Sequence, residues 1–269
     1  MVKTALILGW CLVSFCLFSS PVAAEQLGYK GGDAADPEAL AEDLTDADRH
    51  VQDVMLAIFY HELGHALIDV MQLPVLGLEE DAADVLSVVM IDRLWDADAS
   101  EAMVTAAAQF WANSAAETAE AGYAPDFWGV HSPDERRYYT IICLYYGGAP
   151  DERAALAEAM GLPEDRAVTC PDEFDLAQGS WGVFLDELEE AGPGDTLVWL
   201  GEENPTDGVS QAMKEEVEYL NSILSLPESV GVRVAPCEEA NAFYDPSEKA
   251  ITMCSEMADY ILSSLAANP

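Results

Sequence analysis

Residues 61–84 read HELGHALIDVMQLPVLGLEEDAAD, and they decide how the rest of the chain is interpreted. His61 and His65 are four positions apart, so on a helix both imidazoles lie on one face and can reach the same metal ion. Glu62 points about 100° away around the helix axis, which suits a general base better than a third ligand. The segment therefore predicts a helix that holds a Zn²⁺ ion through two histidines, with a carboxylate beside it.

The residues after this motif predict a reversal of the chain and a second helix. Pro74 and Gly77 interrupt the helical pattern that covers residues 48–70. Apolar residues then recur at helical spacing over residues 78–92. Two helices joined by so short a connection can lie side by side, which would bring the acids at the start of the second helix close to the two histidines.

The acids of this second helix resemble the second zinc helix of gluzincin peptidases. In that clan a Glu binds zinc, and an Asp four residues later accepts a hydrogen bond from the first His ligand. The resemblance implies that Glu80 is the third zinc ligand and that Asp84 orients His61 and fixes its tautomer. Glu79 is the alternative ligand, because it lies next to Glu80 at the same end of the helix.

A closer resemblance is to a bacterial family of unknown function whose members are described as metallopeptidases. It rests on residues 61–84 and, with less specificity, on residues 132–143, 162–170 and 241–254. The last of these begins with Asn-Ala-Phe-Tyr, which the resemblance would place before the zinc helix. Here it follows that helix, as a circular permutation would explain. The resemblance implies a zinc-dependent peptidase that acts on a protein or peptide.

Four further side chains are candidates for stabilising the oxyanion that forms when water attacks a carbonyl group. They are His131, Tyr138, Tyr139 and Tyr244. A tyrosine in an apolar and aromatic stretch is more often part of the core with its hydroxyl group paired. Spacing alone does not rank the four.

The remaining pattern predicts a mostly helical α+β fold. Residues 99–121, 134–146, 151–160, 181–190, 211–224 and 255–265 read as helices, and 230–234 as a strand. Residues 242–253 read as a hairpin that turns at Asp245-Pro246-Ser247. We expect a zincin-like helix pair with a small antiparallel sheet or hairpin near the C-terminus. The expected division is a signal peptide (1–24), an acidic lead-in (25–48), a catalytic region (49–191) and a C-terminal segment (192–269) on the same domain.

The N-terminus and the cysteines predict export. An apolar run of about fourteen residues follows Lys3 and ends before small residues at 22–24, as in a cleaved signal peptide. Four cysteines follow it, an even number that favours disulfides in an exported protein. We expect the pairs Cys143–Cys170 and Cys237–Cys254, because each closes a short segment. The predicted location is secreted or periplasmic.

The net charge of the chain excludes nucleic acid as a partner. Acidic residues number 50 and basic residues 11, a net charge of −39 that repels nucleic acid. No membrane association is expected after signal cleavage.

The leading hypothesis is a zinc peptidase with Glu62 as its base. The alternative is a zinc-stabilised binding or scaffold domain without activity, in which His131 closes the site as a fourth ligand.

Overall fold

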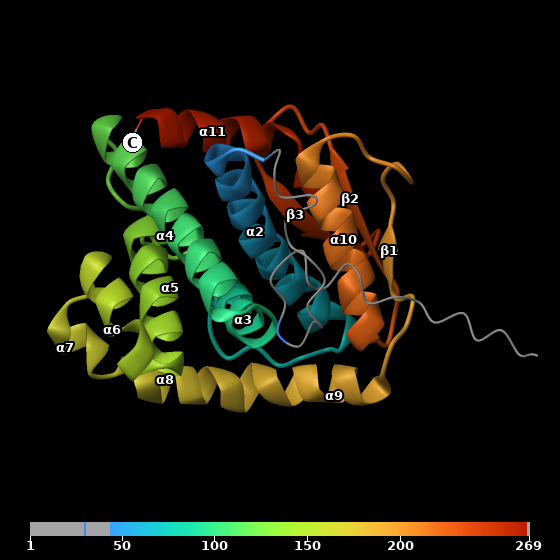
Figure 1. Cartoon of the computed structure of the whole chain (residues 1–269), viewed down its shortest axis with the longest axis horizontal. Coiled ribbons are helices and arrows are strands. Elements are labelled where there is room, and N and C mark those ends of the chain that lie inside the picture. Colours follow the sequence, from blue (N-terminus) through green and yellow to red (C-terminus); the bar gives the residue numbers. More distant parts are fainter. Residues whose placement is uncertain (1–29, 31–43, 268–269) are drawn as a thin grey trace, which may run out of the picture.

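The computed structural model describes Lys30 and residues 44–267 (Figure 1). The predicted signal peptide and nearly all of the predicted lead-in lie outside these residues. No helix among the described residues is both long and apolar enough to span a bilayer.

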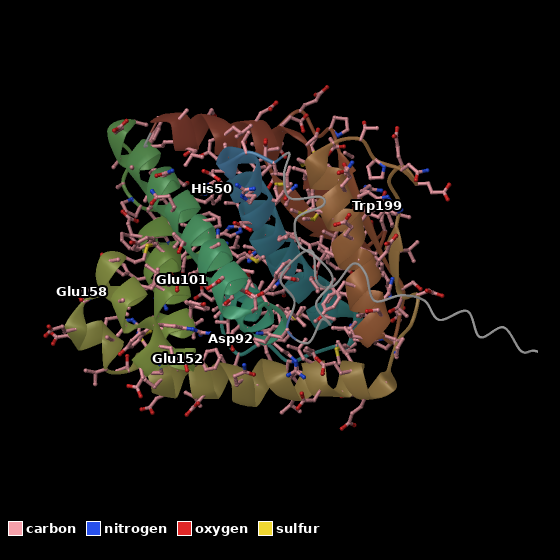
Figure 2. All side chains as sticks on the ribbon, in the orientation of Figure 1. His50, Asp92, Glu101, Glu152, Glu158 and Trp199 are labelled. Atoms are coloured by element: carbon pink, nitrogen blue, oxygen red, sulfur yellow. A yellow bond between two sulfur atoms is a disulfide. The ribbon has the colours of Figure 1, made fainter. Side chains whose placement is uncertain are left out.

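Helices dominate the structure, and a small sheet lies near the C-terminus, so the predicted α+β class is confirmed. The helices are α2 (Asp46–Val70), α3 (Glu79–Leu94), α4 (Ala97–Glu120), α5 (Asp134–Gly148), α6 (Pro150–Ala159), α7 (Glu164–Ala167), α8 (Cys170–Ala177), the π-helical segment η1 (Gln178–Gly182), α9 (Val183–Ala191), α10 (Gly208–Ile223) and α11 (Glu256–Ala267). Acidic side chains such as Glu101, Glu152 and Glu158 are dispersed over the outer faces of these helices (Figure 2). Such an arrangement is typical of a solvated surface.

Helix α2 forms the centre of the fold. It begins at Asp46, two residues before the predicted start, because Thr45 and Asp48 cap it reciprocally. Most of its side chains are buried, since α4 packs on one side and the sheet with α10 on the other (Figure 1). A helix buried on most sides holds its side chains in fixed positions, as a metal site requires.

A glycine sets the distance between the two helices of the predicted site. A Cβ atom on Gly64 would lie 2.9 Å from the Cα atom of Ala83 on α3, closer than real Cβ atoms come. The absence of that atom lets the backbones of α2 and α3 approach one another. Gly64, the fourth residue of the HELGH motif, therefore lets the acids of α3 come within reach of the histidines.

The sheet has four strands in the order β1-β2-β4-β3. Strands β1 (Leu197–Trp199), β2 (Val230–Ala235) and β4 (Ala250–Cys254) run parallel, and β3 (Ala242–Asp245) pairs antiparallel with β4. The predicted hairpin is thus present, as part of a mixed sheet. Strand β3, at the edge of the sheet, lies against α2. There the hydroxyl group of Tyr244 donates a hydrogen bond of 2.7 Å to Asp69.

Both predicted disulfides are present. Cys143–Cys170 joins α5 to α8. Cys237–Cys254 joins the residues after β2 to the end of β4. Each bond restricts the unfolded chain, and both are compatible with an oxidising compartment.

A buried carboxyl group lies between α2 and α10. Glu216 is fully buried; its Oε1 atom accepts a hydrogen bond of 2.7 Å from the hydroxyl group of Tyr60, and Trp95 donates to the same hydroxyl. The Oε2 atom of Glu216 has no hydrogen-bond partner among the described residues. Burial raises the pKa of Glu216 well above 4.5, so the folded chain keeps the carboxyl proton to a higher pH than the unfolded chain.

We expect Glu216→Gln to stabilise the protein at neutral pH. Because the folded-state pKa is raised, the contribution of Glu216 to the stability of the wild type is most favourable below the unfolded value near 4.5 and falls as pH rises towards the folded value. The glutamine keeps an acceptor for Tyr60 and never ionises. Urea unfolding at pH 8 should give a gain of about 1–3 kcal/mol, and the gain should shrink towards pH 4.5. An equal difference at both values would show that Glu216 does not titrate in this way.

Candidate metal centre

Three donor atoms from α2 and α3 converge on one point. The Nε2 atoms of His61 and His65 are 3.2 Å apart, and each is 3.2 Å from the Oε2 atom of Glu80. The three atoms therefore form a nearly equilateral triangle. The two histidines come from successive turns of α2, and Glu80 from the first turn of α3.

The size of this triangle fits a zinc ion. Zinc binds histidine nitrogen and carboxylate oxygen at about 2.0–2.2 Å in tetrahedral sites, so two of its ligand atoms should lie about 3.3–3.5 Å apart. The observed separations of 3.2 Å are close to that value. Two imidazoles and a carboxylate are also the ligand types of catalytic zinc sites. The residues present fit the ion, and one tetrahedral position lies outside their triangle.

His131 reaches the same point from the connection between α4 and α5. Its Nε2 atom is 2.9 Å from the Oε2 atom of Glu80, and its side chain is 53% exposed. Donor atoms of His61, Glu80 and His131 all lie within 4.8 Å of one another, so His131 could also hold an ion. The structure thus brings His131 to the centre, either beside the ion or on it.

A buried network fixes the orientation of His61. Its Nδ1 atom is 2.8 Å from the Oδ1 atom of Asp84, so the nitrogen that faces the triangle is free to bind a metal. Arg137 on α5 donates to both oxygens of Asp84, at 2.8 and 2.6 Å, and its guanidinium group stacks on the Trp111 ring at 3.4 Å. The sequence pointed to Asp84, whereas only the structure reveals that Arg137 holds it.

Glu79 lies on the outer side of the second histidine. Its Oε1 atom is 2.9 Å from the Nδ1 atom of His65, and its side chain is half-exposed. In this arrangement Glu79 orients His65 as Asp84 orients His61. The carboxylate in the triangle is that of Glu80.

The charges of this cluster favour the ionised forms of its members. Burial lowers the pKa of His61, but the hydrogen bonds and charges of Asp84 and Glu80 outweigh it and raise the pKa to about 9. Burial raises the pKa of Asp84, and Arg137 and His61 lower it to about 2. Burial likewise opposes ionisation of Glu80, yet its three histidine neighbours hold the pKa of that carboxyl well below the usual range. Because a metal binds the neutral imidazole, an ion at this site would displace the protons of the histidines and take their place beside the carboxylates.

Glu62 is separate from the triangle and points to the sheet. Glu62 is 6% exposed, and the backbone of Tyr244 on β3 lies near enough to its carboxyl group to lower the pKa. Burial raises the pKa of Glu62, while the neighbouring charges of His61 and His65 lower it. A buried carboxylate one residue from a metal ligand is well placed to accept a proton at the mouth of the cleft.

An open cleft of about 940 Å³ contains this centre. Its walls come from α2, the start of α3, the loop around His131 and strand β3. Among the described residues, four carboxylates but no lysine or arginine line it. A second hollow of about 500 Å³ shares His61, Glu62 and His131 with the cleft and has mainly apolar walls. The centre is therefore accessible from outside.

The four predicted oxyanion stabilisers divide into two pairs. His131 and Tyr244 line the cleft, although the hydroxyl group of Tyr244 already donates to Asp69. Tyr138 and Tyr139 do not line it: the hydroxyl group of Tyr138 donates to the carbonyl oxygen of Met160, and Tyr139 lines a different hollow. Only His131 and Tyr244 therefore lie at the candidate centre.

The model of one protein family, DUF4344, matches residues 28–185 and 207–268, and its description reads "Putative metallopeptidase". The chain belongs to this family. The match covers most of the sequence, including α2, α3, His131 and the hairpin, so every part of the candidate centre lies within family-matched residues. No curated protein and no solved structure matched the chain.

Proposed function

We propose that this protein is an exported zinc-dependent endopeptidase of the gluzincin type, with its zinc held by His61, His65 and Glu80. The observation that carries the proposal is the triangle of donor atoms, each 3.2 Å from the other two, in an open cleft. Membership of a family described as metallopeptidases supports it. The two disulfides support export.

The residues around the centre have distinct parts in this proposal. When bound, a zinc ion would act as a Lewis acid and lower the pKa of water. Glu62 accepts a proton from the attacking water and returns it to the leaving amine. Asp84, held by Arg137, keeps the Nδ1 proton on His61. His131 donates a hydrogen bond to the oxyanion on the substrate carbonyl.

One observation favours a second function, a zinc-stabilised binding domain without catalysis. His131 lies close enough to His61 and Glu80 to complete a four-ligand site. Structural zinc sites are closed in this way, whereas catalytic ones keep a position open. The buried Glu62 favours the peptidase, because a closed site has no use for a carboxylate beside it.

His131→Ala distinguishes the two functions. As a peptidase, the variant should retain about one zinc per chain and lose about 10²–10³-fold in kcat, the usual effect of removing an oxyanion donor. As a scaffold, it should lose zinc affinity and thermal stability together. His50→Ala, at the one histidine outside the centre, is the matched control and should retain zinc and activity. Loss of zinc from His131→Ala, without peptidase activity in the wild type, would overturn the proposal.

A further inference from the structure

Exposed apolar side chains gather around the cleft. Half of the exposed large apolar side chains among the described residues lie on three segments that border it. We call this set the apolar rim; it consists of Leu76 and Leu78 before α3, Tyr123, Phe127, Trp128 and Val130 between α4 and α5, and Phe243 on β3. Apolar groups concentrated at one place on a surface usually mark an interaction site.

The apolar rim is continuous with the candidate metal centre. Leu78, Val130 and Phe243 line the same cleft as the triangle of donor atoms. Val130 and Tyr123 also line an adjoining hollow of about 530 Å³ that the α4–α5 connection forms. A ligand that extends from the cleft past Val130 therefore reaches Tyr123 and the α4–α5 connection, which also carries Phe127 and Trp128.

Two aromatic residues of the rim, Phe127 and Trp128, lie in a defined turn. The Oδ1 atom of Asp126 accepts hydrogen bonds of 3.1 Å from the backbone N–H groups of Trp128 and Gly129. Phe127 and Trp128 project from this turn with 80% and 86% of their surface exposed. Preorganised aromatic side chains bind a partner at a low cost in conformational entropy.

Charge limits the chemistry of the partner. Of the residues that the structure describes, Glu62, Asp69, Glu79 and Glu80 line the cleft, and no lysine or arginine does. In that same part of the chain, Arg137 is the one arginine at the neighbouring apolar hollow, and Asp84 already neutralises it. A segment rich in Asp or Glu would be repelled, whereas a neutral or basic one would not.

We propose that the apolar rim binds an extended, non-acidic polypeptide segment through its apolar side chains and guides it into the cleft. A small ligand would fill only the cleft, whereas the rim residues come from three segments and continue into the adjoining hollow, so an extended chain can contact both. That the segment is then cleaved rests on the proposed function; that it binds does not.

The test measures binding without cleavage. The protein without residues 1–24 and carrying Glu62→Gln is titrated into a fluorescein-labelled peptide of about 20 residues, made of Leu, Phe, Ser and Gln, and fluorescence anisotropy gives the Kd. Adding Phe127→Ser and Trp128→Ser should raise the Kd at least about tenfold, since aromatic anchors dominate such interfaces. The matched control adds Val168→Ser and Val183→Ser, two exposed apolar residues outside the rim, and should leave the Kd unchanged. The same peptide with Asp in place of Ser should bind more weakly.

Each outcome separates this inference from the proposed function. Equal Kd values for the rim and control variants would overturn the inference, as would tighter binding of the acidic peptide. No peptide binding, together with a Trp128 side chain protected from acrylamide quenching, would also overturn it and would indicate that residues 25–43 of the chain cover the rim. Rim-dependent binding by a protein whose wild type cleaves nothing would leave the inference standing and contradict the peptidase.

Discussion

Glu62→Gln should reduce kcat for peptide hydrolysis by about 10²–10⁴-fold, the usual contribution of a general base. Gln has nearly the same shape but cannot accept a proton. Glu62 is buried beside His61 and lies outside the triangle of donor atoms. The Glu62→Gln variant should therefore still hold about one zinc ion per chain. The measurement is hydrolysis of an internally quenched peptide, with zinc content determined on the same sample.

The control for this substitution is Glu101→Gln, which changes an exposed carboxylate on α4 that does not line the cleft. It should keep both activity and zinc. If Glu62→Gln hydrolysed the peptide at the rate of the wild type, Glu62 would not be the base. If it lost zinc, the carboxylate would belong to the metal site itself.

Glu80→Ala should weaken zinc binding by more than the 10–100-fold that typically follows loss of a partner to a metal ligand. The Oε2 atom of Glu80 is the one anionic corner of the triangle, and it also contacts His131. Without it, two neutral imidazoles on one helix face remain, and hydrolysis should fall to background. Competition with a chromophoric chelator gives the zinc Kd of each protein.

Glu79→Ala is the comparison that tests the choice of ligand. Glu79 contacts the Nδ1 atom of His65, the nitrogen that faces away from the triangle. Its removal should therefore cost only about 10–100-fold in zinc affinity. A larger loss in Glu79→Ala than in Glu80→Ala would assign the third ligand to Glu79.

Much of the candidate centre could be predicted from the sequence because helix geometry is local. The spacing of His61 and His65, and of Glu80 and Asp84, places each pair on one helix face without knowledge of the rest of the chain. The pairing of Arg137 with Asp84 joins residues 53 apart, and no local pattern encodes such a distance. His131 is one of several candidates that the sequence offers, but its approach to Glu80 depends on the path of the α4–α5 connection, which no local pattern encodes.

In the fold, too, local features could be predicted from the sequence and long-range contacts could not. The hairpin was predictable, because two short apolar stretches flank an Asp-Pro-Ser turn. The short strand β1 and helices α7 and α8 carry too few residues for a periodic pattern. Strand β1 pairs parallel with β2, and β2 pairs parallel with β4. These pairings depend on the paths of α10 and of the β2–β3 connection, and those paths are set by the packing of the whole fold.

We propose that His61, His65 and Glu80 bind one zinc ion and leave one coordination position open. Anomalous diffraction at the zinc absorption edge, from crystals of the mature protein grown with zinc, tests this most directly. We predict one anomalous peak at about 2.0–2.2 Å from the Nε2 atoms of both histidines and from a carboxylate oxygen of Glu80, with solvent in the remaining position. No peak between α2 and α3, or a peak whose fourth ligand is His131, would contradict the claim.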